Sequence, residues 1–346
     1  MIVVERSPAQ RPTLPTLESV AAAAGVSRGT ASRVLSGSPQ VSERAKTAVL
    51  AAAERLGYAP NLAARALVTR RSDSVAFVVA ESEERFFSDP FFATVLRGAH
   101  TTVARHRIQL LFVVLSTAAD RVQFERFAGG GHIDGALFLS LHGADQLPTQ
   151  LAARGVPVVM AGRPYRTGDA TPYVDADNVG GARLATRVML DQGRRHVGTI
   201  TGPRDMIAAQ DRLDGYRAEL ASHGRRPTKD LIVVGDFSVA GGERAMYTLL
   251  DQRPDLDGVF VANDLMAVGA MQAISTRGRV VPDDIAVVGF DDVPVAAALT
   301  PQLTTVRQPL VRMGEEMASV LLDAIEGRPV RPSVVLPTEL VVRQST

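Results

Sequence analysis

Apolar residues recur at helical spacing in three stretches between residues 16 and 57, each after a residue that can cap free N–H groups. These capping positions are Thr16, Ser27 and Ser42. Gly25 lies between the first two stretches, where it can take the left-handed conformation that a tight turn requires. Two short helices joined through a glycine turn and braced by a third are typical of a helix-turn-helix.

From residue 74 onward, short apolar runs alternate with stretches of helical length. Such runs are typical of strands that are buried on both faces of a parallel sheet. The segments 91–105, 179–192 and 264–276 are long enough to form helices between them. The pattern predicts eight strands, at residues 74–80, 108–114, 133–139, 156–161, 196–201, 231–235, 258–262 and 285–290.

The alternation predicts a doubly wound α/β body with parallel sheets. Eight strands are more than one compact sheet usually needs, so we expect two lobes of similar architecture. We place the passages of the chain between them near residues 173–175, 304–306 and 335–337. The chain thus divides into a tail at 1–15, an all-α helix-turn-helix head at 16–60, a hinge at 61–72 and a body at 73–346. Within the body, we expect lobe 1 to comprise about 73–174 and 305–335, and lobe 2 about 175–304 and 336–346.

The composition fits a globular protein, with 46% hydrophobic and 22% charged residues. No apolar run approaches the ~18 residues of a membrane span, and residues 1–15 lack the apolar region of a signal peptide. Cysteine is absent, which excludes disulfides and thiolate metal sites. We therefore expect a cytoplasmic protein that has no membrane partner and needs no cofactor.

The net charge of +1 is unevenly distributed along the chain. Residues 1–72 carry ten Lys and Arg against four Glu, a net charge of +6, which leaves −5 for the remainder. A basic head on an acidic body is expected of a module that neutralises phosphates, although a solvated basic face is the alternative. The charge therefore favours double-stranded DNA as a partner of the head.

In a helix-turn-helix the second helix lies in the major groove, and its first side chains meet base edges. An arginine there can pair with guanine O6 and N7, which discriminates against other bases by about 1–3 kcal/mol. We expect Arg28 and Arg33 to dominate base recognition, since Gly29 has no side chain to contribute. The candidate DNA contacts of the head are Thr16, Ser27, Arg28, Gly29, Thr30, Ser32 and Arg33.

Enzyme motifs are poorly supported in this chain. Residues 25–29 match the hydrolase pattern G-x-S-x-G, but an alanine-rich helix precedes them in place of the required strand. The sequence lacks a dinucleotide-binding G-x-G-x-x-G after a strand, a phosphate loop and an H-E-x-x-H pair. We expect a protein without catalytic activity.

Ligands of open α/β sheets bind beyond the carboxyl ends of the strands. Arg212, Asn263 and Asp291 supply polar groups there, and the alternatives are that Asn263 holds loop backbone and that Asp291 caps a turn. Rings come from Phe237 and from Phe91 and Phe92, although Phe92 also suits a core position. Polar groups beside aromatic rings favour a sugar.

Several motifs resemble the lactose/galactose repressor family of bacterial regulators. The resemblance begins with TLESVA at 16–21, AGVS at 24–27, TASRVL at 30–35 and LGYAPN at 56–61. It continues with DPFF at 89–92, RLDGY at 212–216, VAND at 261–264, VGFDD at 288–292 and LTTVRQP at 303–309.

The family resemblance implies a periplasmic-binding-protein fold for the body and a homodimer that binds a palindromic operator. It also implies a short hinge helix in the minor groove, with Leu67 as the residue that wedges between base pairs and with Asn61 and Ala64 beside it. Family members hold their effectors at the positions of Phe91, Phe92, Arg212, Phe237, Asn263, Asp291 and Gln308, and Asp89 and Arg163 complete our candidate effector contacts. Induction, in which the effector releases the protein from DNA, is the commoner behaviour in the family, and co-repression is the alternative. The rival interpretation of the whole chain is a sugar-binding protein that does not read DNA.

The sequence departs from sugar-binding relatives at Gly162, where many of them carry an aspartate. Either Arg163 replaces that aspartate or the pocket accepts a larger ligand. The purine-sensing branch places an arginine where Asp205 and Met206 stand here, which argues against a nucleobase. We expect a mono-, di- or oligosaccharide.

Overall fold

The computed structural model describes all residues except 1–14, 36–37, 39, 59–70, 167 and 169. The chain divides into two compact units, residues 1–72 and 73–346. No helix in the described part of the chain is both long enough and apolar enough to cross a membrane.

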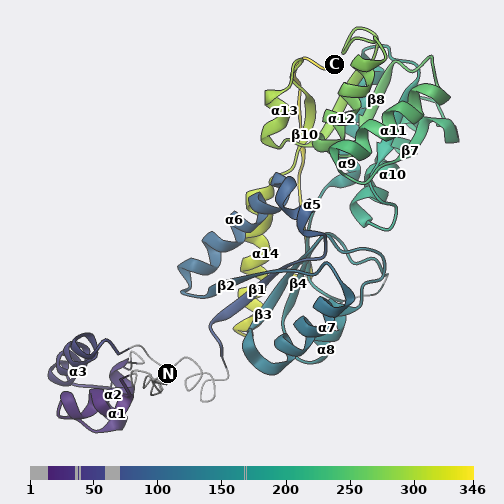
Figure 1. Cartoon of the computed structure of the whole chain (residues 1–346). Helices are drawn as coiled ribbons and strands as arrows, with labels where there is room; N and C mark the ends of the chain where they lie inside the picture. Colours follow the sequence, from purple (N-terminus) through teal and green to yellow (C-terminus); the bar gives the residue numbers. More distant parts are fainter. Residues whose placement is uncertain (1–14, 36–37, 39, 59–70, 167, 169) are drawn as a thin grey trace, which may run out of the picture. The chain divides into compact units, whose positions relative to one another are not determined.

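The described residues of the first unit form three helices, α1 (Leu17–Ala23), α2 (Arg28–Leu35) and α3 (Glu43–Leu56) (Figure 1). Their predicted caps are present: Thr16 Oγ1 accepts from Ser19 N at 3.2 Å, Ser27 Oγ from Thr30 N at 3.1 Å and Ser42 Oγ from Ala45 N at 3.3 Å. Gly25, with φ +66°, makes the turn between α1 and α2. One small core, with buried members Val20, Ala21, Ala31, Val34, Val49, Ala52 and Ala53, joins the three helices.

The second unit contains two six-stranded sheets, one in each lobe. The lobe 1 sheet has the order β11-β5-β4-β3-β1-β2, and all its strands are parallel. Its strands are β1 (Ser74–Val79), β2 (Gln109–Val114), β3 (Gly135–Leu139), β4 (Val158–Ala161), β5 (Tyr173–Ala176) and β11 (Ser333–Leu336).

The lobe 2 sheet has the order β12-β10-β9-β8-β6-β7, in which only the β10–β12 pair is antiparallel. Its strands are β6 (Val197–Thr201), β7 (Ile232–Val234), β8 (Gly258–Val261), β9 (Ala286–Asp291), β10 (Thr304–Arg307) and β12 (Glu339–Val341).

Helices cover both faces of each sheet (Figure 1). In lobe 1, α6 (Pro90–Arg105) and α14 (Leu310–Ile325) share a core with Val75, Phe77 and Val79, whereas α7 (Ala118–Phe127) and α8 (Leu147–Ala153) cover the opposite face. In lobe 2, α11 (Val239–Gln252) and α12 (Asp264–Thr276) cover one face, and α9 (Asn178–Asp191) and α10 (Ile207–Ser222) cover the other. Shorter helices are α5 (Glu83–Ser88), α13 (Pro294–Ala298), a π-helical turn (Ala128–His132) and a 3-10 turn (Lys229–Leu231).

The chain passes between the lobes three times. It enters lobe 2 after β5, returns to lobe 1 after β10, and re-enters lobe 2 after β11. Two of the segments that sequence analysis treats as passages, 173–175 and 304–306, are themselves strands, so these passages lie after Ala176 and after Arg307. The remaining passage lies between Leu336 and Glu339, beside the expected 335–337.

Helices α6 and α14 approach closely because glycines face each other across their contact. A Cβ atom on Gly98 would lie 2.0 Å from Val311 O, and one on Gly314 would lie 2.0 Å from Val95 O. Any side chain at either position would therefore meet helix backbone. This helix pair closes the lobe 1 core.

Candidate nucleic-acid interface and ligand cavity

Helix α2 presents polar side chains to solvent at the positions predicted to contact DNA. Arg28, Gly29, Ser32 and Arg33 are exposed. Arg28 Nε lies 2.9 Å from Glu18 Oε1 on α1. That pair occupies one edge of the guanidinium and leaves the two terminal nitrogens to a partner such as a guanine edge.

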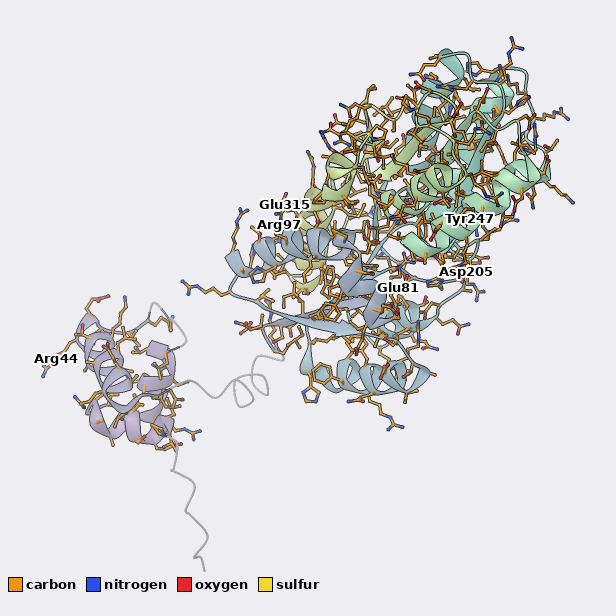
Figure 2. All side chains as sticks on the ribbon, turned by 45° about the horizontal axis from the view of Figure 1, so that its top comes forward. Arg44, Glu81, Arg97, Asp205, Tyr247 and Glu315 are labelled. Carbon is orange, nitrogen blue, oxygen red and sulfur yellow. The ribbon has the colours of Figure 1, made fainter. Side chains whose placement is uncertain are left out.

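The two hydroxyls at the start of α2 interact with each other. Ser27 Oγ and Thr30 Oγ1 are 2.9 Å apart, and Ser27 Oγ also caps the helix, as expected from the sequence. Thr16 is likewise exposed beside its own cap interaction. Arg44, which stands out from α3 in Figure 2, and Lys46 are further exposed cations that sequence analysis did not select. Asn61, Ala64 and Leu67 lie outside the described residues.

The body contains a cavity of about 680 Å³ that is lined by residues of both lobes. All nine effector positions chosen from the sequence line this cavity, namely Asp89, Phe91, Phe92, Arg163, Arg212, Phe237, Asn263, Asp291 and Gln308. Its size falls within the range of small-molecule sites, roughly 300–1,000 Å³. The residues group there because most follow the carboxyl ends of strands or begin the next helix.

Arg212 on α10 is the buried cation of the cavity. Its Nε donates to Asn178 Oδ1 at 2.9 Å and its Nη1 to Ala262 O at 2.5 Å, while Nη1 lies 3.6 Å from Asp291 Oδ1. The guanidinium carbon lies 3.9 Å from the centre of the Phe290 ring. These contacts fix the guanidinium at the wall of the cavity.

Asp291 ends β9 in a conformation with φ +108° that few side chains adopt. Its Oδ1 accepts from Gln308 Nε2 at 2.6 Å, which links β9 to the passage after β10. Burial raises the pKa of Asp291 to about 7, although the positive charge of Arg212 acts against this rise. Arg212 and Gln308 thus hold the carboxyl group at the wall of the cavity.

Two further carboxyl groups line the cavity. Asp89 caps α6 by accepting from Phe91 N at 3.0 Å, and burial raises its pKa. Asp175 accepts from Arg163 N at 3.1 Å and from Asn178 Nδ2 at 3.0 Å, and burial raises its pKa to about 6. The cavity is thus rich in hydrogen-bond acceptors.

Asn263 serves mainly to hold backbone, which is one of the alternatives left open by the sequence. Its Oδ1 caps α12 by accepting from Met266 N at 3.0 Å, and its Nδ2 donates to Phe237 O at 3.0 Å. It thereby fixes Phe237, whose ring lies where a side chain of Gly202 would otherwise extend. Asn263 is therefore a positioning residue for an aromatic wall.

Arg85, Asp175 and Asn178 also line the cavity and were missed by sequence analysis. Asp175 lies in β5, and Asn178 begins the helix that follows. The hydrophobic pattern does not predict this strand, so the rule that selects polar residues after strands could not find either residue. The guanidinium of Arg85 lies 5.0 Å from the Phe237 ring centre. Its helix, α5, begins shortly after the predicted strand at 74–80, but sequence analysis did not select Arg85.

Side chains from the two lobes meet across the cleft. Arg85 Nη1 donates to Asp236 O at 2.8 Å, and Arg163 pairs with Asp211 on α10. His142 Nδ1 lies 3.0 Å from Asp205 Oδ2 of lobe 2, and its Nε2 lies 3.2 Å from Glu81 Oε1 of lobe 1. Figure 2 labels Glu81 and Asp205 on their two sides of this contact.

Gly162 leaves open space at the position where sugar-binding relatives are expected to carry an aspartate. It has φ +85°, and nothing lies within 4 Å of the place of its missing Cβ. Arg163 turns to Asp211. Among the residues that the structure describes, no cluster of acidic residues and histidines suits a metal ion.

A basic helix-turn-helix joined to a two-lobed α/β body, whose cavity combines apolar walls with polar groups, defines a ligand-responsive DNA-binding regulator. The family model for bacterial regulatory proteins of the lacI family matches residues 16–61, and that for the periplasmic binding protein-like domain matches residues 186–346. The chain is 46% identical over 341 residues to the HTH-type transcriptional regulator CelR of Thermobifida fusca, covering 97% of this chain and 99% of CelR. It therefore belongs to the LacI family of transcriptional regulators.

Solved structures agree with this assignment. A complex of transcriptional regulator CelR with cellobiose superimposes with a TM-score of 0.77 at 43% identity, covering 96% of this chain and 100% of that one. The Lac repressor dimer bound to operator and the anti-inducer ONPF gives a TM-score of 0.83 at 26% identity, covering 96% of this chain and 99% of that one.

Proposed function

We propose that the protein is a homodimeric, non-enzymatic repressor that binds a palindromic operator in the cytoplasm and leaves it when a neutral β-linked glucose disaccharide fills the cavity. The similarity to a CelR that was solved with cellobiose supports this choice of effector. The observation that carries the proposal is the charge pairing of the inner cavity, in which Arg85, Arg163 and Arg212 already have carboxylate partners.

The pairing favours an uncharged ligand over a sugar phosphate. Arg212 faces Asp291, Arg163 faces Asp211 and Arg85 faces Glu81. A phosphate group would have to compete with these carboxylates for the same guanidinium groups. Sugar hydroxyls instead donate to the carboxylates, and the rings of Phe91, Phe92 and Phe237 offer apolar faces.

For the head, we propose that Arg28 reads a guanine, supported by the exposed terminal nitrogens described above. Arg28→Ala should relax the preference at one base pair in each half-site of the operator, measured by competition among single-base operator variants. Glu18→Gln, which keeps Arg28 but weakens its ion pair with residue 18, is the control and should relax the base preference less. An unchanged preference in Arg28→Ala would remove this residue from base recognition.

For the segment between the units, we propose that residues 61–72 act as the hinge, with Asn61, Ala64 and Leu67 at the minor groove. Insertion of a leucine side chain would unstack one step, at a cost of a few kcal/mol that bending then offsets through added contacts. The lobes would control the hinges of the two subunits through the cleft, because a ligand shifts a balance only by its differential affinity for the two states.

The test is selection of random double-stranded DNA on the purified protein, followed by re-binding of the enriched pool with cellobiose, lactose, glucose, ribose or glucose 6-phosphate. We expect a palindromic site that cellobiose releases. Failure to enrich any sequence at moderate salt would overturn the DNA-binding role of the head. Release by glucose 6-phosphate alone would contradict the neutral effector, and tighter binding with a sugar would indicate a co-repressor.

A further inference from the structure

The cavity continues past the cleft between the lobes into a groove on lobe 1. One wall is a single face of α8 and of the residue before it, with Gln146, Thr149, Gln150 and Ala153 at helical spacing. The other wall includes Pro164, Tyr165 and Arg166, which follow β4. We call this extension, defined by these seven residues, the outer groove.

The polar groups of the inner cavity are largely committed to one another. Asn178 binds Arg212, Gln308 binds Asp291, and Asn263 binds Phe237 O and Met266 N. These bonds shape the inner cavity whether or not a ligand is present.

The outer groove differs in this respect. Asp145, and not Gln146, caps α8 by accepting from Leu147 N at 3.0 Å. Within the part of the chain that the structure describes, the side-chain amides of Gln146 and Gln150 form no hydrogen bond to protein. Two amides four residues apart thus offer both donors and acceptors along one wall.

An aromatic ring stands on the opposite wall. Tyr165 is 46% exposed, although its ring is large and mostly apolar. Gly162, which shortly precedes Tyr165 in the chain and also lines the cavity, has nothing within 4 Å of the place of its missing Cβ. An exposed ring opposite free amides is suited to a sugar ring, whose faces are apolar and whose edge carries hydroxyls.

Two cations near the groove are already paired with carboxylates, whereas Arg166 of the groove itself is exposed and has no ion-pair partner among the described residues. Arg121 pairs with Asp145 at the start of α8, and Arg163 pairs with Asp211. We propose that the outer groove is a second sugar subsite, which holds the third unit of a linear β-linked glucose oligosaccharide whose first two units fill the inner cavity. This inference rests on the proposed function, because it extends the same effector site.

The experiment is calorimetric titration of the full-length protein with cellobiose, cellotriose and cellotetraose. We expect cellotriose to bind about tenfold more tightly than cellobiose, which corresponds to ~1.4 kcal/mol of added contact, and cellotetraose to add little. Tyr165→Ala and Gln150→Ala should each remove most of this gain while leaving the affinity for cellobiose unchanged. Tyr165→Phe, which keeps the ring, should retain it.

Gln272→Ala is the matched control, since Gln272 is an exposed glutamine on a helix of lobe 2 that does not line the cavity. Equal affinities for cellobiose and cellotriose in the wild-type protein would overturn the subsite. So would an equal loss for both sugars in Tyr165→Ala. Binding of neither sugar would instead refute the proposed effector, so the two failures are distinguishable.

Discussion

At the scale of single residues, the cavity depends on a buried cation and a buried carboxyl group that compensate each other. Arg212 and Asp291 are both 5% exposed. Removing one member of a buried pair leaves a charge without compensation, which typically costs about 3–5 kcal/mol. The same pair also directs Gln308 and Asn178, so its loss would deform several walls at once.

Arg212→Met should therefore abolish the response to the effector and lower the free energy of unfolding by a few kcal/mol. The head should still bind operator, because it folds around its own core. Operator binding by fluorescence anisotropy, with and without sugar, and chemical denaturation measure these effects.

The double variant Arg212→Met with Asp291→Asn is the control for this change. It should recover much of the lost stability, because no unpaired charge remains, but not the response to sugar. A single variant that still responds to sugar would exclude Arg212 from the effector site.

Sequence reasoning succeeds for residues tied to a strong local signal. Asn263 follows and Asp291 ends a strand with a clear apolar run, Arg212 lies in the family motif at 212–216, and all three line the cavity. Arg85 and Tyr165 follow the clearly predicted strands β1 and β4, but they lie several residues beyond the strand ends, on a six-residue helix and in an irregular loop, so a rule that selects the first polar residues after a strand does not reach them. Their roles follow only from what the fold brings near them.

At the scale of elements, the close contact of α6 with α14 joins chain segments that are more than two hundred residues apart. Gly98→Ala would place a methyl group 2.0 Å from Val311 O, so the helices must separate. We expect a loss of about 1–3 kcal/mol in the free energy of unfolding, as is typical of overpacking, measured by urea denaturation. Ala104→Ser, at an exposed position on the same helix, should change it far less. If Gly98→Ala and Ala104→Ser have the same free energy of unfolding, the two helices can separate at little cost and the prediction is wrong.

The sequence predicts some strands more clearly than others. The eight predicted strands are found close to their expected bounds because most are buried on both faces and so read as apolar runs. The four missed strands, β5, β10, β11 and β12, have three or four residues each. In β11 and β12 most positions are half-buried or exposed, so the apolar signal is diluted, and pairing with a distant strand decides their conformation.

At the scale of the whole molecule, the contacts across the cleft hold the two lobes of the body together. Gly143 N donates to Asp205 O at 2.8 Å beside the histidine contact. Hydrogen bonds from the His142 ring to the carboxylates of Glu81 and Asp205 raise the pKa of His142, whereas partial burial opposes this rise. Protonated His142 would thus bridge a carboxylate of lobe 1 and one of lobe 2, with Arg85 also facing Glu81.

A histidine whose pKa is raised in the closed body favours closure most below its ordinary pKa, and this contribution is lost as pH rises through the raised value. If the effector binds the closed body, its affinity should fall as pH increases from 6 to 8. His142→Ala should flatten that dependence relative to the wild-type protein, measured by calorimetry in buffers of equal ionic strength. His100→Ala, a histidine outside the cavity, is the control. An identical pH profile in His142→Ala would refute the role of this contact.

The three passages between the lobes also have a consequence for synthesis of the protein. The lobe 1 sheet needs β11 and its core needs α14, both of which come from the last forty residues, and the lobe 2 sheet needs β12. Neither lobe can complete its core while the ribosome still holds this segment, whereas the helices α1 to α3, which share the core of the head, end at residue 56. A nascent chain therefore carries a finished DNA-reading head long before it can sense a sugar, and a premature stop codon anywhere before residue 310 would leave a head without a working sensor.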